Sequence, residues 1–413
     1  MSKLYGNAVV GQSGGPTAAI NATLVGVVRG VIEQGQNGGA IGKLYGMRNG
    51  IEGLLQERLV DLEIFAKDEQ KLSALELTPA AALGSCRKKL PKIEDDPAFY
   101  EQLLAVFKKY DIRYFFYIGG NDSMDTVSKL SAAMAKMGYD MRVMGVPKTI
   151  DNDLEGTDHT PGFGSAAKYV ATTVSEIIRD AAVYTTKAVT IVEIMGRDAG
   201  WLTTSAALGR LANGEEPDLV YLPEKPFCMD EFISSVKTAL ERHPNVVVAV
   251  SEGIRFADGT YVGAGAQSGV KDVFGHQYLA GTGKALEYAV REKIGCKVRS
   301  VELNVSQRCA GHLVSATDIE DSVAIGRAAA FAAERGESGK MMLYRRVSNA
   351  PYACEIDCAD VHEIANKIKC VPDEYINAEH NGITDACLEY LRPLIKGEKY
   401  PKYVNGLPEQ IIL

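Results

Sequence analysis

The chain has 413 residues, of which 46% are hydrophobic and 24% are charged, and its formal net charge is −8 at pH 7. This length exceeds the size at which one hydrophobic core usually stops growing, so we expect two packed lobes. The negative charge argues against nucleic acid or an anionic membrane as a partner. An anionic ligand would therefore need a local cluster of Arg and Lys.

The eight cysteines are scattered and form no C-x-x-C pair, which is typical of free thiols in a reducing cytosol. The first residues, MSKLYGNAVVG, contain no apolar core of a secretion signal. No apolar run approaches the ~20 residues that span a bilayer. We therefore expect a cytoplasmic protein without a membrane partner.

Short apolar runs alternate with amphipathic stretches along the chain. Strands are predicted at residues 8–10, 41–45, 113–120, 141–146, 189–194, 245–250 and 297–303. Helices are predicted from 20 and from 97, and at 122–138, 165–182, 202–211, 229–242, 278–293 and 318–335. Repeated strand–helix–strand units predict an α/β fold with mainly parallel sheets covered by helices. After about residue 350 the pattern weakens, and we expect helical and irregular structure appended to the core.

Two glycine-rich turns follow predicted strands and open predicted helices. In GQSGGPT and IGGNDS, glycine lets backbone N–H groups approach phosphate oxygens at a helix N-terminus. Oxygen atoms of Asn121, Asp122 and Asp125 would suit a magnesium ion. A tight turn and a helix N-cap account for these two patterns equally well.

The segment VPKTIDND is more specific. Asp151 and Asp153 flank Asn152 just after a predicted strand, next to Lys148 and Thr149. One carboxylate could take a proton from a hydroxyl, while Lys148 neutralises charge on a phosphoryl group in transfer. A surface Asx-turn is the alternative interpretation.

Further polar residues follow other predicted strands. Arg197 in MGRDAGW has a planar fork that suits phosphate, and Glu252 in SEG could accept hydrogen bonds from a substrate hydroxyl. Arg299 and Arg308 complete a candidate basic cluster for a second phosphate. Because an isolated Arg is usually a surface charge, none of these residues decides the function alone.

Taken together and in this order, GGNDS, PKTIDND, MGR and SEG resemble the 6-phosphofructokinase family over roughly residues 5–335. The resemblance implies two α/β lobes with the active site in the cleft between them. It implies a donor-binding lobe at residues 1–155, a sugar-phosphate-binding lobe at 156–335 and a C-terminal extension packed on the core at 336–413.

The resemblance also implies roles around the donor. Gly15 resembles a residue at the donor phosphates, and Arg87 resembles an arginine between the donor and acceptor phosphates. Asn121 stands where the family usually has a magnesium-binding Asp, which implies Mg²⁺ as the cofactor with weaker ligation by a neutral amide.

For the acceptor, the resemblance implies fructose 6-phosphate. Asp151 resembles the proton acceptor for its 1-hydroxyl, with Thr149 beside it on the transferred phosphoryl group. Arg299 resembles an arginine contributed by a neighbouring subunit, which implies a homo-oligomer, either a dimer or a tetramer. The sugar-phosphate ligands are completed by Met195, Gly196, Arg197, Glu252 and Arg308.

Donor choice depends on Asp122 and Lys148. In ATP-dependent members the corresponding segments resemble GGDGS and PGTIDND, with glycine at the positions of Asp122 and Lys148. The glycine at the position of Asp122 leaves room for the nucleotide α-phosphate. An Asp there fills that space and repels the phosphate, whereas pyrophosphate ends before it. Lys148 then supplies positive charge to the transferring and leaving phosphates. The pair resembles the signature of pyrophosphate-dependent members, which implies a reversible transfer from pyrophosphate.

Three alternatives stay open at this point. They are an ATP-dependent 6-phosphofructokinase, a related kinase acting on NAD or a lipid, and a catalytically inactive sugar-phosphate sensor. The related kinase has no reason to carry PKTIDND and MGR together. Asp151 argues against the sensor, while Asn121 keeps it under consideration.

Overall fold

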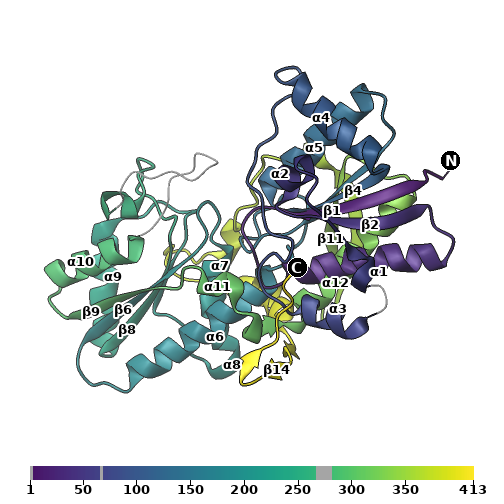
Figure 1. The fold of residues 1–413 in the computed structure, drawn as a ribbon. Coiled ribbons are helices and arrows are strands. Elements are labelled where there is room, and N and C mark those ends of the chain that lie inside the picture. The colour runs from purple at the N-terminus through teal and green to yellow at the C-terminus, as the bar shows by residue number, and fades with distance from the viewer. Residues whose placement is uncertain (1–2, 66–67, 267–280) are drawn as a thin grey trace.

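The computed structural model describes residues 3–65, 68–266 and 281–413, and Figure 1 shows two sheets that form the centres of two lobes. The first sheet has seven strands in the order β12-β11-β5-β4-β1-β2-β3. Its central strands are parallel, and β3 and β12 are antiparallel edges. The strands are β1 (Gly6–Gln12), β2 (Ile41–Met47), β3 (Leu59–Asp61), β4 (Ile112–Gly119), β5 (Arg142–Pro147), β11 (Lys340–Asn349) and β12 (Tyr352–Asp360).

Helices cover both faces of this sheet because its central strands are apolar on both sides. Along β4, Phe116 faces the core under α1 (Ile20–Gln36) and α12 (Ala316–Glu334), and Phe115 faces the core under α4 (Pro97–Lys109) and α5 (Asn121–Lys136). Glycine lets α1 and α12 pack closely. A Cβ at Gly26 would lie 2.2 Å from the Val323 carbonyl oxygen.

The second sheet has four parallel strands in the order β7-β8-β6-β9. They are β6 (Ala188–Ile194), β7 (Leu219–Tyr221), β8 (Asn245–Ser251) and β9 (Lys297–Glu302). Helix α6 (Phe163–Ala182) packs on one face, and α9 (Met229–Arg242) and α10 (Thr282–Lys293) pack on the other. Among the described residues, no helix combines the length and apolar character needed to cross a membrane.

The C-terminal region contacts both lobes. After β12 come α13 (Val361–Ile364), a 3-10 turn at Asp373–Tyr375 and α14 (Asp385–Leu391). Ile364 belongs to the core beside α5, whereas Cys387 and Leu391 belong to the core beneath α6. In Figure 1 this region, coloured yellow-green to yellow, runs between the two sheets.

The predicted α/β class with parallel sheets is confirmed, as is each predicted strand. The helical and irregular structure expected after residue 350 is wrong for β12. This segment is an edge strand in which exposed and half-buried residues alternate over residues 352–357. The predicted helix at 202–211 is instead three short pieces, α7 (Trp201–Thr204), a 3-10 turn (Ser205–Leu208) and α8 (Gly209–Asn213). The hydroxyls of Thr204 and Ser205 donate to carbonyls within this segment and so compete with regular helix bonding.

The helix expected at 278–293 is present from Thr282, and residues 278–280 lie outside the described part of the chain. Helix α12 lies within the segment predicted as the second lobe but packs on α1 of the first. The assignment of residues 1–155, 156–335 and 336–413 to three functional units stays a prediction.

Candidate active site

The glycine-rich loop after β1 is tied to the segment that carries Arg87. The Gly14 N–H donates to the Cys86 carbonyl at 3.2 Å, and the Ser85 hydroxyl donates to the Gly14 carbonyl at 2.5 Å. Gly14 has φ +75°, a conformation that favours glycine. These contacts bring Arg87 to the edge of the loop that contains Gly15.

Lys148 connects this loop with the segment after β5. Its side chain is buried, and its ammonium donates a hydrogen bond to the Gly15 carbonyl. A Cβ at Gly15 would lie 3.4 Å from the Arg308 guanidinium. Burial lowers the pKa of Lys148 to about 7, with Arg308 and Arg87 acting in the same direction and Asp151 against it. Three cationic side chains therefore share one small region.

The next residues form a tight polar turn. The Thr149 hydroxyl accepts the Asp151 N–H at 3.1 Å and lies 3.4 Å from the Asp151 carboxylate. Asn152 has φ +54°. Desolvation raises the pKa of Asp151, although Arg197 and Lys148 oppose the shift, and desolvation with the nearby Asp151 charge raises the pKa of Asp153. Two carboxyls with raised pKa values in one turn fit a general base or a cation site.

The second lobe contributes the loops after β6 and β8. The Gly196 N–H donates to the Glu252 carboxylate at 3.3 Å, and the Ser251 hydroxyl donates to the Gly196 carbonyl at 2.5 Å. Gly196 has φ +133°. Burial raises the pKa of Glu252 to about 8, and the Asp151 charge adds to that rise. The interaction of Glu252 with Asp151 places the loops of the two lobes in one site.

Arg197 and Met195 follow β6. The Met195 N–H donates to the Gln307 side chain at 3.3 Å, which ties this loop to the short helix carrying Arg308. Within the described part of the chain, nothing accepts a hydrogen bond from the buried Nε of Arg197. An unpaired buried donor is costly, so Arg197 fits an anionic or hydroxylated ligand.

Asn121 and Asp122 begin α5, directly after β4. The Asp122 carboxylate lies 3.4 Å from the Lys89 ammonium. The Asn121 side chain is held by the C-terminal region, because its oxygen accepts the Asn366 N–H at 2.5 Å and its amide donates to the Lys367 carbonyl at 2.7 Å. The carbonyl oxygen of Asn121 keeps a second lone pair, so this contact does not exclude metal ligation.

Arg299 is the predicted site residue that stands apart. It is exposed on β9, the edge strand of the second sheet, and it pairs in register with Thr190 of β6. The other predicted residues gather at the C-terminal ends of β1, β4, β5, β6 and β8, or on segments packed against them. They are Gly15, Arg87, Asn121, Asp122, Lys148, Thr149, Asp151, Met195, Gly196, Arg197, Glu252 and Arg308. Their individual roles stay predictions.

Sequence reasoning missed the polar residues behind the Asp151–Asp153 turn. Asn152 donates to the Tyr390 hydroxyl at 2.9 Å, and Tyr390 donates to the Asp158 carbonyl at 2.6 Å. Lys369 also donates to Asn152. Tyr390 and Lys369 lie more than 200 residues away in a segment without a motif, so no sequence signal marked them.

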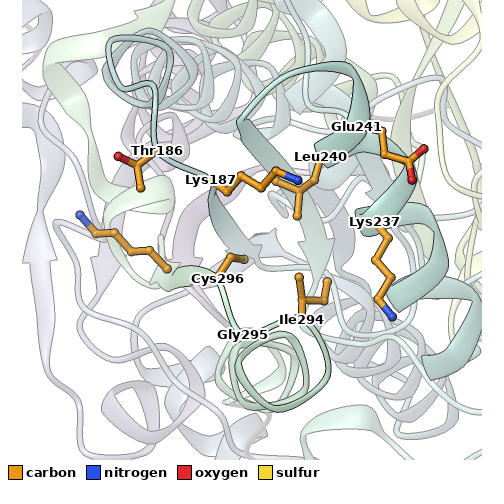
Figure 2. Close-up of a pocket in the computed structure, with 9 residues that line it drawn as sticks. Thr186, Lys187, Lys237, Leu240, Glu241, Ile294, Gly295 and Cys296 are labelled. Carbon is orange, nitrogen blue, oxygen red and sulfur yellow. The ribbon is translucent and has the colours of Figure 1, made fainter.

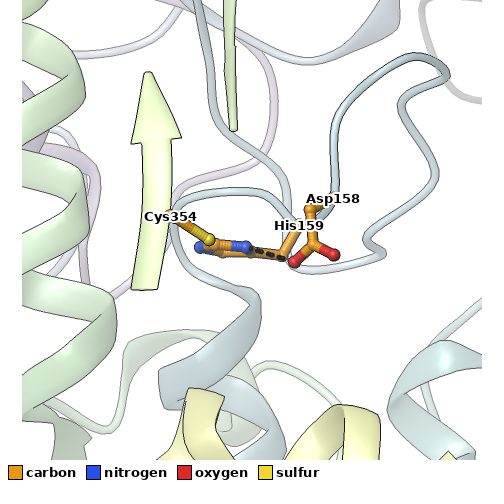
Figure 3. A group of neighbouring side chains, drawn as sticks. All are labelled: Asp158, His159 and Cys354. Carbon is orange, nitrogen blue, oxygen red and sulfur yellow. Dashed lines mark hydrogen bonds and ion pairs between the residues drawn. The ribbon is translucent and has the colours of Figure 1, made fainter. Parts of the chain in front are cut away.

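A charged cluster lies beyond this layer (Figure 3), where Asp158, His159 and Cys354 place potential metal ligands within 4.8 Å of one another. The buried His159 ring lies 2.9 Å from the Asp158 carboxylate and 3.2 Å from that of Asp321. Burial alone would lower the pKa of His159, but these two hydrogen bonds raise it. Arg346 also binds Asp158, at 2.8 Å. Two cations thus already balance the carboxylates, and the cluster is best described as an ion-pair network.

A surface pocket of about 590 Å³ lies elsewhere (Figure 2). It is lined by residues before β6, on the last turns of α9 and before β9, among them Lys187, Leu240 and Cys296. These residues lie at the N-terminal ends of the strands. Ligands of parallel sheets bind at the C-terminal ends, so this pocket is not the candidate active site.

Comparison with known proteins agrees with this geometry. Residues 7–332 match the family model described as phosphofructokinase. The chain belongs to the phosphofructokinase family. It is 42% identical to a pyrophosphate–fructose 6-phosphate 1-phosphotransferase of Halomonas elongata, over 98% of this chain and 95% of the relative. A protein of the same name from Methylococcus capsulatus is 43% identical, over 98% and 96%.

The solved structures lead to the same family. A pyrophosphate-dependent phosphofructokinase from Nitrosospira multiformis superposes with a TM-score of 0.88 at 38% identity, covering 99% of this chain and 96% of that one. The resemblance of GGNDS, PKTIDND, MGR and SEG to the phosphofructokinase family is therefore confirmed. So is the two-lobe fold that it implied.

Proposed function

We propose that this phosphofructokinase transfers a phosphoryl group from pyrophosphate to the 1-hydroxyl of fructose 6-phosphate, reversibly, giving fructose 1,6-bisphosphate and phosphate. The observation that carries the proposal is the placement of Lys148. Its buried ammonium contacts the glycine-rich loop at Gly15 and lies in the charge field of Asp151 and Arg308. The relatives from Halomonas elongata and Methylococcus capsulatus carry the same activity in their names.

In this proposal Asp151 is the general base. The oxygen of the 1-hydroxyl attacks the transferred phosphorus, the bond from that phosphorus to the leaving phosphate breaks, and the hydroxyl proton moves to Asp151. The raised pKa of Asp151 makes its carboxylate a better proton acceptor near neutral pH. Thr149 beside it would contact the transferred group.

Lys148 and the arginines stabilise charge. Burial lowers the pKa of Lys148, but a bound pyrophosphate would favour its protonated form, since opposite charges attract strongly in a low-dielectric site. Its charge then acts on the migrating phosphoryl group. Arg87 would approach both phosphates. Arg197, Glu252 and Arg308, with Met195 and Gly196, would hold the sugar phosphate.

Phosphotransferases of this kind generally use a divalent metal, and we propose Mg²⁺. The site fits one, because Asp151 and Asp153 place two buried carboxyls in one turn, where desolvation raises the pKa of both and the Asp151 charge further raises that of Asp153. Asp153 would hold the ion with Asn121, through the free lone pair of its carbonyl oxygen. A bound Mg²⁺ would neutralise charge on the phosphate oxygens.

We further propose a cytoplasmic homo-oligomer, a dimer or a tetramer, without nucleic acid or membrane partners. The exposed position of Arg299 on β9, an edge strand of the second sheet, supports this assembly, since its side chain would then complete a site on a neighbouring copy. The net charge of −8 supports the absence of nucleic acid.

One experiment tests the donor and the reaction together. We expect fructose 1,6-bisphosphate and phosphate to form with pyrophosphate, and kcat/KM with ATP to be lower by orders of magnitude. A preference for ATP would favour the ATP-dependent alternative. Absence of turnover with either donor, combined with binding of fructose 6-phosphate, would favour the sugar-phosphate sensor.

A further inference from the structure

Residues 365–371 cross the candidate site, and we call this segment the strap. On the first lobe its backbone is bound at the start of α5 and at the turn that carries Asp151 and Asp153. The Asn366 N–H and the Lys367 carbonyl both pair with the Asn121 side chain, and the Lys369 N–H donates to the Asp153 carbonyl at 2.9 Å. The strap therefore contacts both the start of α5 and the turn that carries Asp151.

The same segment is bound to the second lobe. The Trp201 indole N–H donates to the Lys369 carbonyl at 2.7 Å. The Val371 N–H donates to the Glu224 carboxylate at 2.9 Å, and that same carboxylate oxygen accepts the Gly200 N–H at 2.8 Å. Gly200 and Trp201 directly follow the loop of Arg197. The strap thus joins the loop after β5 to the loop after β6.

The Lys369 side chain occupies the centre of this junction. Its ammonium donates to the side-chain oxygen of Asn152 at 3.2 Å. It also donates to the backbone carbonyls of Thr157 at 3.0 Å and Asp158 at 2.8 Å. All three N–H donors of the ammonium are therefore used. The same nitrogen lies 5.1 Å from the centre of the Trp201 ring.

These contacts supplement the Thr149–Asp151 hydrogen bonds within the turn. Asn152 has φ +54°, a left-handed conformation that Asn tolerates better than most residues other than glycine, and its side chain is fully buried. Its oxygen binds Lys369 and its amide binds Tyr390. Asp151 and Asp153 stand on either side, so the direction of both carboxylates depends on how Asn152 is held.

We infer that Lys369 is a positioning residue for phosphoryl transfer. It orients the Asp151–Asn152–Asp153 turn and fixes the turn against Trp201, which follows the loop of Arg197. The inference rests on the proposed function, because it assigns Asp151 as the base. Lys369 would touch no reacting atom. A small misplacement of a catalytic group lowers the rate of the chemical step more than it weakens substrate binding.

The main test is Lys369→Met, which keeps the aliphatic stem and removes the ammonium. We expect kcat to fall by roughly 10–100-fold in both reaction directions, while KM for each substrate changes by less than about threefold. Lys402→Met is the matched control, because Lys402 is 73% exposed and forms a surface ion pair with Glu409. The control should retain wild-type kcat.

Trp201 provides a second readout that does not depend on activity, since it is the single tryptophan of the chain. We expect Lys369→Met to change its native emission while fluorescence titration gives an unchanged Kd for fructose 6-phosphate. Lys369→Gln keeps two N–H donors, and we expect its kcat to lie between those of Lys369→Met and the wild type. Lys369→Gln also provides the kinetic test if Lys369→Met does not fold.

The outcomes separate the two claims. Wild-type enzyme without pyrophosphate activity would overturn the proposed function, whatever the variants do. With an active wild type, full kcat in both Lys369 variants would overturn the positioning role. In a third outcome, kcat, the fraction of folded protein and the number of fructose 6-phosphate binding sites all fall by the same factor. Lys369 would then be a purely structural residue, and the positioning role would be overturned as well.

Discussion

The Lys148 ammonium donates a hydrogen bond to the Gly15 carbonyl, which links the loop after β5 to the glycine-rich loop after β1. We predict that Lys148→Met lowers kcat with pyrophosphate by about 10²–10³-fold, because a charge beside the migrating phosphoryl group acts mainly in the transition state. The melting temperature should stay the same or rise, since the variant removes a buried ammonium. Steady-state kinetics and thermal unfolding check both. A normal kcat would contradict the assigned role.

Asp151 is predicted to take the proton from the 1-hydroxyl. We expect Asp151→Asn to lower kcat by roughly 10²–10⁴-fold with a modest change in KM for fructose 6-phosphate, the range for a positioned base. The side chains have nearly equal size, so the fold should be kept. Near-normal turnover would remove this role. Asp180→Asn, on the last turn of α6 and away from the candidate site, is the matched control and should leave kcat unchanged.

Much of this site could be predicted from short segments, and the reason is local. Gly15, Lys148, Asp151, Arg197 and Glu252 each follow a strand whose apolar pattern is visible in the sequence. Parallel strands then bring their C-terminal ends to one edge. The same reasoning cannot find a residue whose position depends on tertiary packing alone.

The strap shows where such reasoning ends. Lys369 reaches Asn152 only because β12 returns the chain to the first sheet and α14 then packs under α6. The strap itself has no periodic apolar pattern, and most of its hydrogen bonds come from its backbone. Backbone contacts leave no residue preference that a sequence could display. The break of the predicted helix at 202–211 has a similar origin in hydroxyl–carbonyl bonds.

His159 should make the stability of the protein depend on pH. Its hydrogen bonds to Asp158 and Asp321 raise its folded pKa above the ordinary value near 6.5. The stabilisation by the charged ring is therefore complete below about pH 6.5 and is lost as the pH rises through the folded pKa. We expect His159→Gln to lower the free energy of unfolding by about 3 kcal/mol at pH 6 and by less at pH 9. Urea unfolding at both pH values checks this, and an equal loss at both would contradict it.

Arg299 is predicted to serve the site of a neighbouring subunit. Mixing Arg299→Ala chains with Asp151→Asn chains should then restore activity, because a hybrid contains one site with both wild-type groups. Random mixing of dimers would rebuild about a quarter of the sites. Unmixed variants give the baseline. An active monomer by light scattering would exclude the shared site, and so would hybrids no more active than their parents.

The sharpest prediction concerns the donor. Asp122 begins α5 beside the glycines that follow β4, and its carboxylate is 37% exposed and paired with Lys89 at 3.4 Å. An exposed pair of this kind is weak, so Lys89 does not cancel the repulsion of a third phosphate. A carboxylate about 4 Å from a phosphate costs about 1 kcal/mol in water and more in a cleft. We therefore expect Asp122→Gly to raise the ratio of kcat/KM for ATP over pyrophosphate by about tenfold or more.

Asp122→Asn separates charge from size, and it should give a smaller rise because the amide still fills the space. Both donors are measured for all three enzymes at one fixed Mg²⁺ concentration. A ratio that stays unchanged in Asp122→Gly would remove this physical reason for donor choice, while a wild type that already prefers ATP would overturn the donor assignment itself.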